Sequence, residues 1–134
     1  MDRQEREKAS ELRREIVQSQ TEGSRHLERI LAKRSLLGGS LYEWKRRCGA
    51  KSCRCRKGVL HSSWILSYRQ DGKLRKKTIP AEEVSRYQVW VQAYRDFRAD
   101  RAGLVKVHAN LCRLLRELEE ELMDKPPWER GKCS

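Results

Sequence analysis

The sequence has no apolar run of about 18 residues, which excludes a helix that crosses a membrane. Its first eleven residues are charged throughout and include no apolar segment, so a cleaved secretory signal is not expected. The expected compartment is the cytoplasm, where the five cysteines stay reduced unless a metal binds them.

Catalytic motifs are also missing from the sequence. There is no phosphate-binding glycine loop, no nucleophile elbow and no cluster of acidic residues suited to Mg²⁺. The run His26-Leu27-Glu28-Arg29 matches the H-x-x-R letters of tyrosine recombinases, but a chain of 134 residues is too short for the rest of that catalytic domain. We attribute the match to chance and predict a protein that is not an enzyme.

Acidic residues are nearly absent from the middle of the chain. Residues 45–77 contain twelve basic residues and one acid, and so carry +11 of the formal net charge of +12. Because charge of one sign repels itself, this segment favours an anionic partner such as a phosphate backbone, although a solvated basic surface is the alternative. The residues predicted to contact DNA phosphates are Arg46, Arg47, Lys51, Arg54, Arg56, Lys57, Arg69, Lys73, Arg75, Lys76 and Lys77.

The C-terminal part of the sequence predicts one long helix over 81–124, followed by a tail at 125–134. Large residues recur there at spacings of three and four, which is typical of a coiled-coil seam, and proline occurs at both boundaries. The predicted seam consists of Tyr87, Trp90, Tyr94, Phe97, Arg101, Leu104, His108, Leu111, Leu115, Leu118 and Leu122. Its polar members, Arg101 and His108, are expected to set the register.

Residues 1–37 show a thinner seam and predict an N-terminal helical segment, either two helices or one frayed helix. Gly38-Gly39-Ser40 is expected to end it. The seam residues are Ala9, Leu12, Ile16, Ser19, Gly23, His26 and Ile30. This segment either folds back on the leucine-rich part of the long helix, 101–124, as an antiparallel hairpin, or leaves those leucines to pair with a second copy in a homodimer.

Residues 38–100 are predicted to form a small basic head together with the start of the long helix. Strands are expected at 41–47, 64–70 and 73–79, with Asp71-Gly72 as a two-residue hairpin turn that places Gln70 opposite Lys73. One face of the hairpin carries Trp64, Leu66, Tyr68 and Ile79, and the other carries Arg69, Lys76 and Thr78. We expect the first face to pack on the helix aromatics, which favours a core role for them over base stacking. The predicted fold class is α+β: a three-stranded basic head with a cysteine loop, flanked by an N-terminal helical segment and a long coiled-coil-like helix.

The cysteine loop contains a candidate zinc site formed by Cys48, Cys53, Cys55 and His61. Three thiolates and an imidazole within 14 residues suit a tetrahedral Zn²⁺, which would hold together a loop too short and too basic to bury a core. The alternatives are thiols without a metal, and thiolates activated for redox chemistry by the surrounding cations.

The central segment also contains a distinctive set of short motifs. They are Gly39-Ser40-Leu41, Arg46-Arg47-Cys48-Gly49, Cys53-Arg54-Cys55, Gly58, Leu60-His61, Trp64, Ser67-Tyr68-Arg69 and Asp71-Gly72-Lys73. With these motifs, about residues 38 to 100 resemble a family of small bacterial accessory proteins found beside transposases and tyrosine-type integrases. Three strands followed by a helix are similar to the arm-type DNA-binding domains of integrases. The resemblance implies a DNA-associated accessory role.

The sequence as a whole predicts a non-enzymatic, DNA-binding accessory factor in transposition or site-specific recombination. Its expected partners are double-stranded DNA, a recombinase or transposase, and a second copy of the chain. Two alternatives stay open, because an RNA-binding or ribosome-associated protein would use the same charge, and a coiled-coil adaptor could bind an acidic protein through the basic head.

Overall fold

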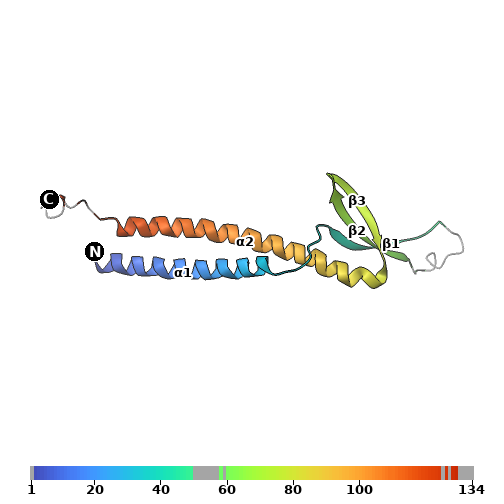
Figure 1. The fold of residues 1–134 in the computed structure, drawn as a ribbon, viewed down its shortest axis with the longest axis horizontal. Helices are drawn as coiled ribbons and strands as arrows, with labels where there is room; N and C mark the ends of the chain where they lie inside the picture. Colours follow the sequence, from blue (N-terminus) through green and yellow to red (C-terminus); the bar gives the residue numbers. More distant parts are fainter. Residues whose placement is uncertain (1, 50–57, 59, 125, 127, 130–134) are drawn as a thin grey trace. The chain divides into compact units, whose positions relative to one another are not determined.

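The computed structural model describes residues 2–49, 58, 60–124, 126 and 128–129. The fold is α+β, as predicted, with the order α1 (Arg3–Leu31), β1 (Ser40–Arg46), β2 (His61–Gln70), β3 (Lys73–Ile79), the 3₁₀ turn η2 (Ala81–Glu83) and α2 (Val84–Leu122) (Figure 1). No helix within these described residues is long and apolar enough to span a membrane.

The chain divides into two compact units. The helical unit comprises Met1–Ala32 and Ala99–Ser134, and the sheet unit comprises Lys33–Arg98. Helix α2 therefore contributes its first part to the sheet unit and the remainder to the helical unit.

In the helical unit, α1 is a single helix of 29 residues. It begins with a capping box, in which the Asp2 carboxylate accepts a hydrogen bond from the Glu5 N–H at 2.8 Å and the Glu5 carboxylate accepts one from the Asp2 N–H at 2.8 Å. Gly23 does not interrupt it. A Cβ at Gly23 would lie 3.0 Å from Cγ1 of Val107, so the missing side chain lets α1 and α2 approach closely. The buried residues of α1 all belong to the predicted seam: Ala9, Leu12, Ser19 and Gly23.

Helix α1 runs antiparallel to the second part of α2 within this unit (Figure 1). Lys8 Nζ lies 2.8 Å from Glu121 Oε1 near one end of the pair, and His26 Nδ1 lies 2.9 Å from Asp100 Oδ1 near the other. Of the two uses that the sequence allows for the leucine-rich segment, the intramolecular hairpin is the one present in this fold.

The seam on α2 differs by one residue from the predicted seam. Asp100, Val107 and Leu114 are buried, whereas the predicted Arg101, His108 and Leu115 are exposed. The prediction that Arg101 and His108 set the register is therefore wrong. Two heptad frames that differ by one residue both include Leu104, Leu111 and Leu118. The prediction used the frame with the larger residues, and the other frame is the buried one. The smaller Val107 fits against Gly23, and Asp100 meets charged partners on α1.

The sheet unit contains an antiparallel sheet in the order β1-β2-β3. The register of β2 and β3 is as predicted, with Gln70 opposite Lys73 and Trp64 opposite Ile79. Asp71 and Gly72 have φ angles of +52° and +77°, and two positive φ angles are what a type I′ turn requires. Strand β2 begins earlier than predicted, because pairing with β1 continues to His61.

The core of the sheet unit lies between one face of the sheet and the start of α2. Its buried cluster consists of Leu66, Ile79, Val84 and Val91, with Leu37, Leu41, Trp64, Tyr68 and Tyr87 packed against it. The face predicted to pack on the helix is therefore the one that does so. On α2, Tyr87 contacts the core as predicted, whereas the two valines were not in the predicted seam.

The connection between α1 and β1 also differs from expectation. Helix α1 ends at Leu31, well before Gly38, because Ala32 turns to an extended conformation with ψ of 135°. The Leu37 N–H then donates to the Trp90 carbonyl oxygen at 3.1 Å. A Cβ at Gly39 would lie 2.7 Å from the Ser67 carbonyl oxygen. The glycine pair thus allows close packing of the connection on the sheet unit rather than ending the helix.

Candidate nucleic-acid interface

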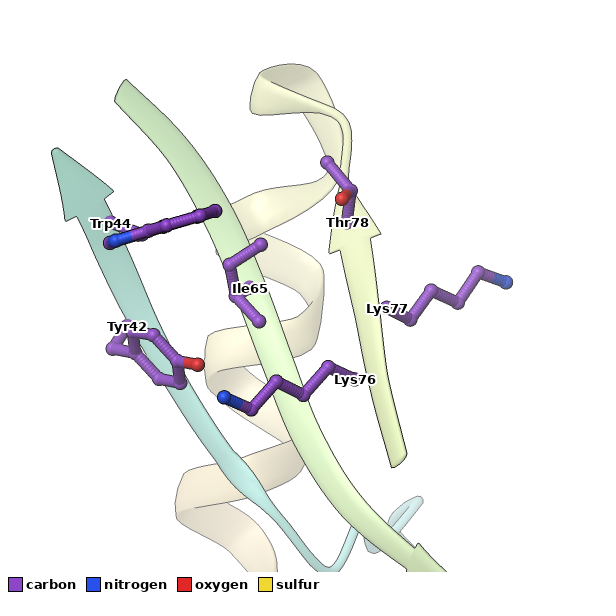
Figure 2. A pocket seen from close by; sticks show the side chains of 6 residues that line it. All are labelled: Tyr42, Trp44, Ile65, Lys76, Lys77 and Thr78. Atoms are coloured by element: carbon purple, nitrogen blue, oxygen red, sulfur yellow. The ribbon is translucent and has the colours of Figure 1, made fainter. Parts of the chain in front are cut away.

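The face of the sheet opposite α2 carries an aromatic and basic surface. Side chains alternate along a strand, so Leu41 in the core places Tyr42 and Trp44 on the other side, and Leu66 likewise places Ile65 there. We call this side the outer face, and it comprises Tyr42, Trp44 and Arg46 of β1, Ile65 and Arg69 of β2, and Lys76 and Thr78 of β3. Figure 2 views it with α2 behind the sheet.

A hollow of about 380 Å³ lies on the outer face, lined by Tyr42, Trp44, Ile65, Lys76, Lys77 and Thr78 (Figure 2). Tyr42 is opposite Ile65, and Ile65 is opposite Thr78, so the three residues form one row across the sheet. Ile65 is only 8% exposed. Helix α2 does not cover it, because α2 lies on the other face of the sheet, so the neighbouring side chains on the outer face bury it. Tyr42 and Trp44 are 37% and 47% exposed.

Cations border the two aromatic residues. The Arg46 guanidinium carbon lies 4.5 Å from the centroid of the Trp44 ring, in cation–π contact. The Lys76 side chain extends across β2 toward Tyr42, whereas Lys77 points away from the sheet (Figure 2). Within the three strands, every residue of which the structure describes, Glu43 is the only acid, and it alternates away from the outer face. The outer face is therefore positively charged.

Seven of the predicted phosphate contacts fall in the described part of the chain, and all seven are exposed: Arg46, Arg47, Arg69, Lys73, Arg75, Lys76 and Lys77. Arg46, Arg69 and Lys76 lie on the outer face, whereas the other three on β3 alternate toward the opposite side. Lys51, Arg54, Arg56 and Lys57 lie outside the described residues. The structure thus places three of the predicted cations on the outer face, with Arg46 at one end of the sheet and Arg69 and Lys76 toward the other, and three more along the β3 edge.

A second hollow lies where the sheet meets α2. It measures about 580 Å³, and its lining includes Arg69, Arg95, Arg98, Tyr68 and Tyr94 but no acidic residue. Arginine pairs well with phosphate because its planar donors can bind two oxygens at once. The sequence prediction did not include the two arginines of α2.

Sequence reasoning also missed Tyr42, Trp44 and Ile65 as surface residues of one site. The signal was present in the alternation of residues 41–47, which places the two aromatics on the same side of a strand. The connection between β1 and β2 is too long to determine the register, so the row that joins Tyr42, Ile65 and Thr78 could not be derived.

The candidate zinc ligands are only partly described. Cys48 follows β1 and His61 begins β2, and because Arg46 is opposite His61, both lie at the same end of the sheet. Cys53 and Cys55 lie outside the described residues. Among the residues that are described, no group of three or more His, Cys, Asp or Glu side chains could hold a metal. Zinc therefore stays a prediction.

A cluster of titratable residues in the helical unit has a structural role. His26 Nδ1 and Arg29 Nε each lie 2.9 Å from Oδ1 of the buried Asp100. Hydrogen bonds from His26 and then Arg29 hold the pKa of the Asp100 carboxyl below its ordinary value. A Cβ at Gly103 would lie 2.6 Å from His26 Cε1, so this glycine makes room for the ring. The residues of the H-x-x-R run thus join α1 to α2.

Comparison with curated proteins and with solved structures finds no match. A family model described as "Domain of unknown function (DUF6788)" matches residues 3–89, which include α1, all three strands and the start of α2. This description names no activity, so the resemblance to recombinase accessory proteins stays a prediction. Because the match covers more than half of the sequence, the chain belongs to the DUF6788 family.

Proposed function

We propose that this protein is a non-enzymatic, cytoplasmic accessory factor that binds DNA in complexes of transposition or site-specific recombination. The observation that carries the proposal is the concentration of charge, since residues 45–77 carry +11 of the total of +12. Three of the exposed cations of the sheet unit lie on the outer face opposite α2, and three more lie along the β3 edge. A phosphate backbone is the partner that such a surface fits best.

In the proposed mechanism, the sheet unit approaches double-stranded DNA with its outer face and its β3 edge. Strands of a sheet can enter a DNA groove, where cations on both sides reach the phosphates. Arg46 and Lys76 contact phosphates from the outer face, and Lys73 contacts them from the β3 edge. Such contacts position the protein but carry no sequence information directly, so a bound recombinase would supply the choice of site.

The helical unit has the role of assembly in this proposal. Its surface exposes several large apolar residues, namely Val17, Leu27, Leu31, Val105, Leu115 and Leu122. We propose that some of these residues contact a second copy or a recombinase. Two bound DNA sites would then be held in a defined geometry.

Zn²⁺ bound by Cys48, Cys53, Cys55 and His61 is part of the proposal as a structural support of the sheet unit. The two described candidates lie at the same end of the sheet, as ligands of one metal must. A structural zinc would tie the long connection between β1 and β2 to the strands and so position its cations.

The experiment that tests the proposal is the salt dependence of binding to duplex DNA, measured on the full chain by fluorescence anisotropy. If a protomer neutralises about six phosphates, log K should fall with log salt at a slope of roughly −5, and a dimer that uses both sheet units should double this slope. Lys73→Glu with Lys76→Glu should weaken binding to every DNA sequence and make the slope shallower.

The matched control is Lys106→Glu with Arg116→Glu, which makes the same change in net charge on exposed residues of the helical unit. Arg113 is unsuitable because it pairs with Glu117 at 2.7 Å. If both double variants weaken binding equally, or if the slope is near zero, the charged sheet unit is not the DNA-binding surface. Stronger binding to structured RNA would favour the RNA-binding alternative, and binding to neither nucleic acid would favour the adaptor.

A further inference from the structure

We propose that the outer face binds an unpaired nucleic-acid strand, with bases stacked on Tyr42 and Trp44 and phosphates held by the bordering cations. This inference rests on the proposed function, since it names the part of a recombining nucleic acid that the sheet unit holds. An unpaired strand is the form in which ring faces of bases are accessible to protein side chains.

The spacing of the two aromatic residues is the first argument. Tyr42 and Trp44 lie two positions apart on β1 and point to the same side, as Figure 2 shows. Two residues along a strand span about 6.8 Å. This is about twice the 3.4 Å rise between stacked bases of a duplex strand. The two rings therefore suit a strand whose bases are splayed apart rather than stacked on each other.

The exposure of the same residues is the second argument. Trp44 and Tyr42 are 47% and 37% exposed, while Ile65 between them and β3 is 8% exposed. Neither aromatic belongs to the core cluster on the other face of the sheet. Their rings border the hollow of about 380 Å³, so a planar ligand could contact them there. Aromatic residues placed this way contribute little to the core and are available to a base.

The surrounding polar groups suit a nucleotide. Arg46 already covers the Trp44 ring at 4.5 Å, and a base on the ring's other side would complete a stack of guanidinium, indole and base. Lys76 extends over the hollow, where it can meet a phosphate, and Thr78 supplies a hydroxyl for a hydrogen bond to a base edge. Because the bordering charges are cationic, an anionic strand fits this hollow better than an apolar protein segment.

The test uses the full chain with labelled oligothymidylate, oligouridylate and a mixed-sequence duplex of equal length. The unaltered protein should bind both single strands more tightly than the duplex at the same salt concentration. Its tryptophan fluorescence should be quenched by the single strands, because a base stacked on an indole ring quenches it. The single strand that binds more tightly shows whether the outer face prefers unpaired DNA or unpaired RNA.

Substitutions separate stacking from charge. Trp44→Ala, and independently Tyr42→Ala, should lower the affinity for single strands by roughly 5- to 150-fold and lower the affinity for the duplex much less, because paired bases cannot stack on either ring. Trp44→Phe should retain most of the affinity but lose the part of the quenching due to Trp44. The matched control is Trp128→Ala, which removes a tryptophan that is 74% exposed and outside the sheet, and it should leave the affinity unchanged.

Two results would overturn the inference and leave nucleic-acid binding intact. One is tighter binding to the duplex than to the single strands by the unaltered protein, which requires no variant to fold. The other is equal loss of single-strand and duplex affinity in Trp44→Ala and Tyr42→Ala. By contrast, failure of the unaltered protein to bind either DNA probe, the oligothymidylate or the duplex, would refute the proposed function itself.

Discussion

Replacing Leu114 with alanine should destabilise the helical unit far more than replacing its neighbour Leu115. Leu114 is 1% exposed, whereas Leu115 is 52% exposed. Leucine to alanine removes three carbons, which at about 0.8 kcal/mol each is about 2.4 kcal/mol of lost transfer free energy at a buried position. A residual cavity raises the cost at Leu114 to between about 2.5 and 5 kcal/mol. At Leu115, water already covers about half of the side chain and fills the space left, so the cost is about 1 kcal/mol or less.

The measurement is urea unfolding followed by far-ultraviolet circular dichroism, with both variants compared with the unaltered protein. The midpoint should fall clearly for Leu114→Ala and little for Leu115→Ala, with similar slopes. Equal costs, or a larger cost for Leu115→Ala, would refute the assignment of the seam to Val107 and Leu114. Sedimentation of Leu115→Asp tests the proposed role of this exposed residue in assembly separately, because loss of self-association would shift a dimer to a monomer.

Two further predictions concern ionisation and metal. A carboxyl whose folded-state pKa is lowered contributes stability that is fully present above its unfolded pKa, about 3.9 for aspartate, and is lost as pH falls through the folded value. Asp100→Asn should therefore be less stable than the unaltered protein at neutral pH. It should also lose less helicity when the pH is lowered below about 3.9. Identical acid transitions of the two proteins would contradict the role of Asp100. Purified protein should contain about one zinc per chain, and Cys53→Ser should release it. A metal-free preparation that melts at an unchanged temperature would show that zinc does not stabilise the fold.

The sheet shows how far sequence reasoning reaches when the connection between two elements is short. Asp71-Gly72 determines the register of β2 and β3, because a two-residue turn of this type leaves one pairing. Nothing comparable links β1 to β2. The hollow around Ile65 depends on that second register, so its existence could not be derived from the sequence.

The helical unit shows a different limit. The hydrophobic repeat predicted that both helices have a seam, and on α1 the buried residues are the predicted ones. On α2 two frames one residue apart satisfy the same repeat. The choice depends on partners across the hairpin, namely Gly23 against Val107 and His26 against Asp100. Such pairings are known only once the alignment of the two helices is known.

The order of the strands has a consequence for solubility. Strand β3 is an edge strand, so one side of its backbone has no neighbour in the sheet and could pair with the edge of another molecule. Four of its seven residues are cationic, namely Lys73, Arg75, Lys76 and Lys77. Like charges on two such edges repel, and lysine on an edge strand is a common protection against aggregation. Neutralising these cations would therefore remove a repulsion that keeps the β3 edges of two molecules apart.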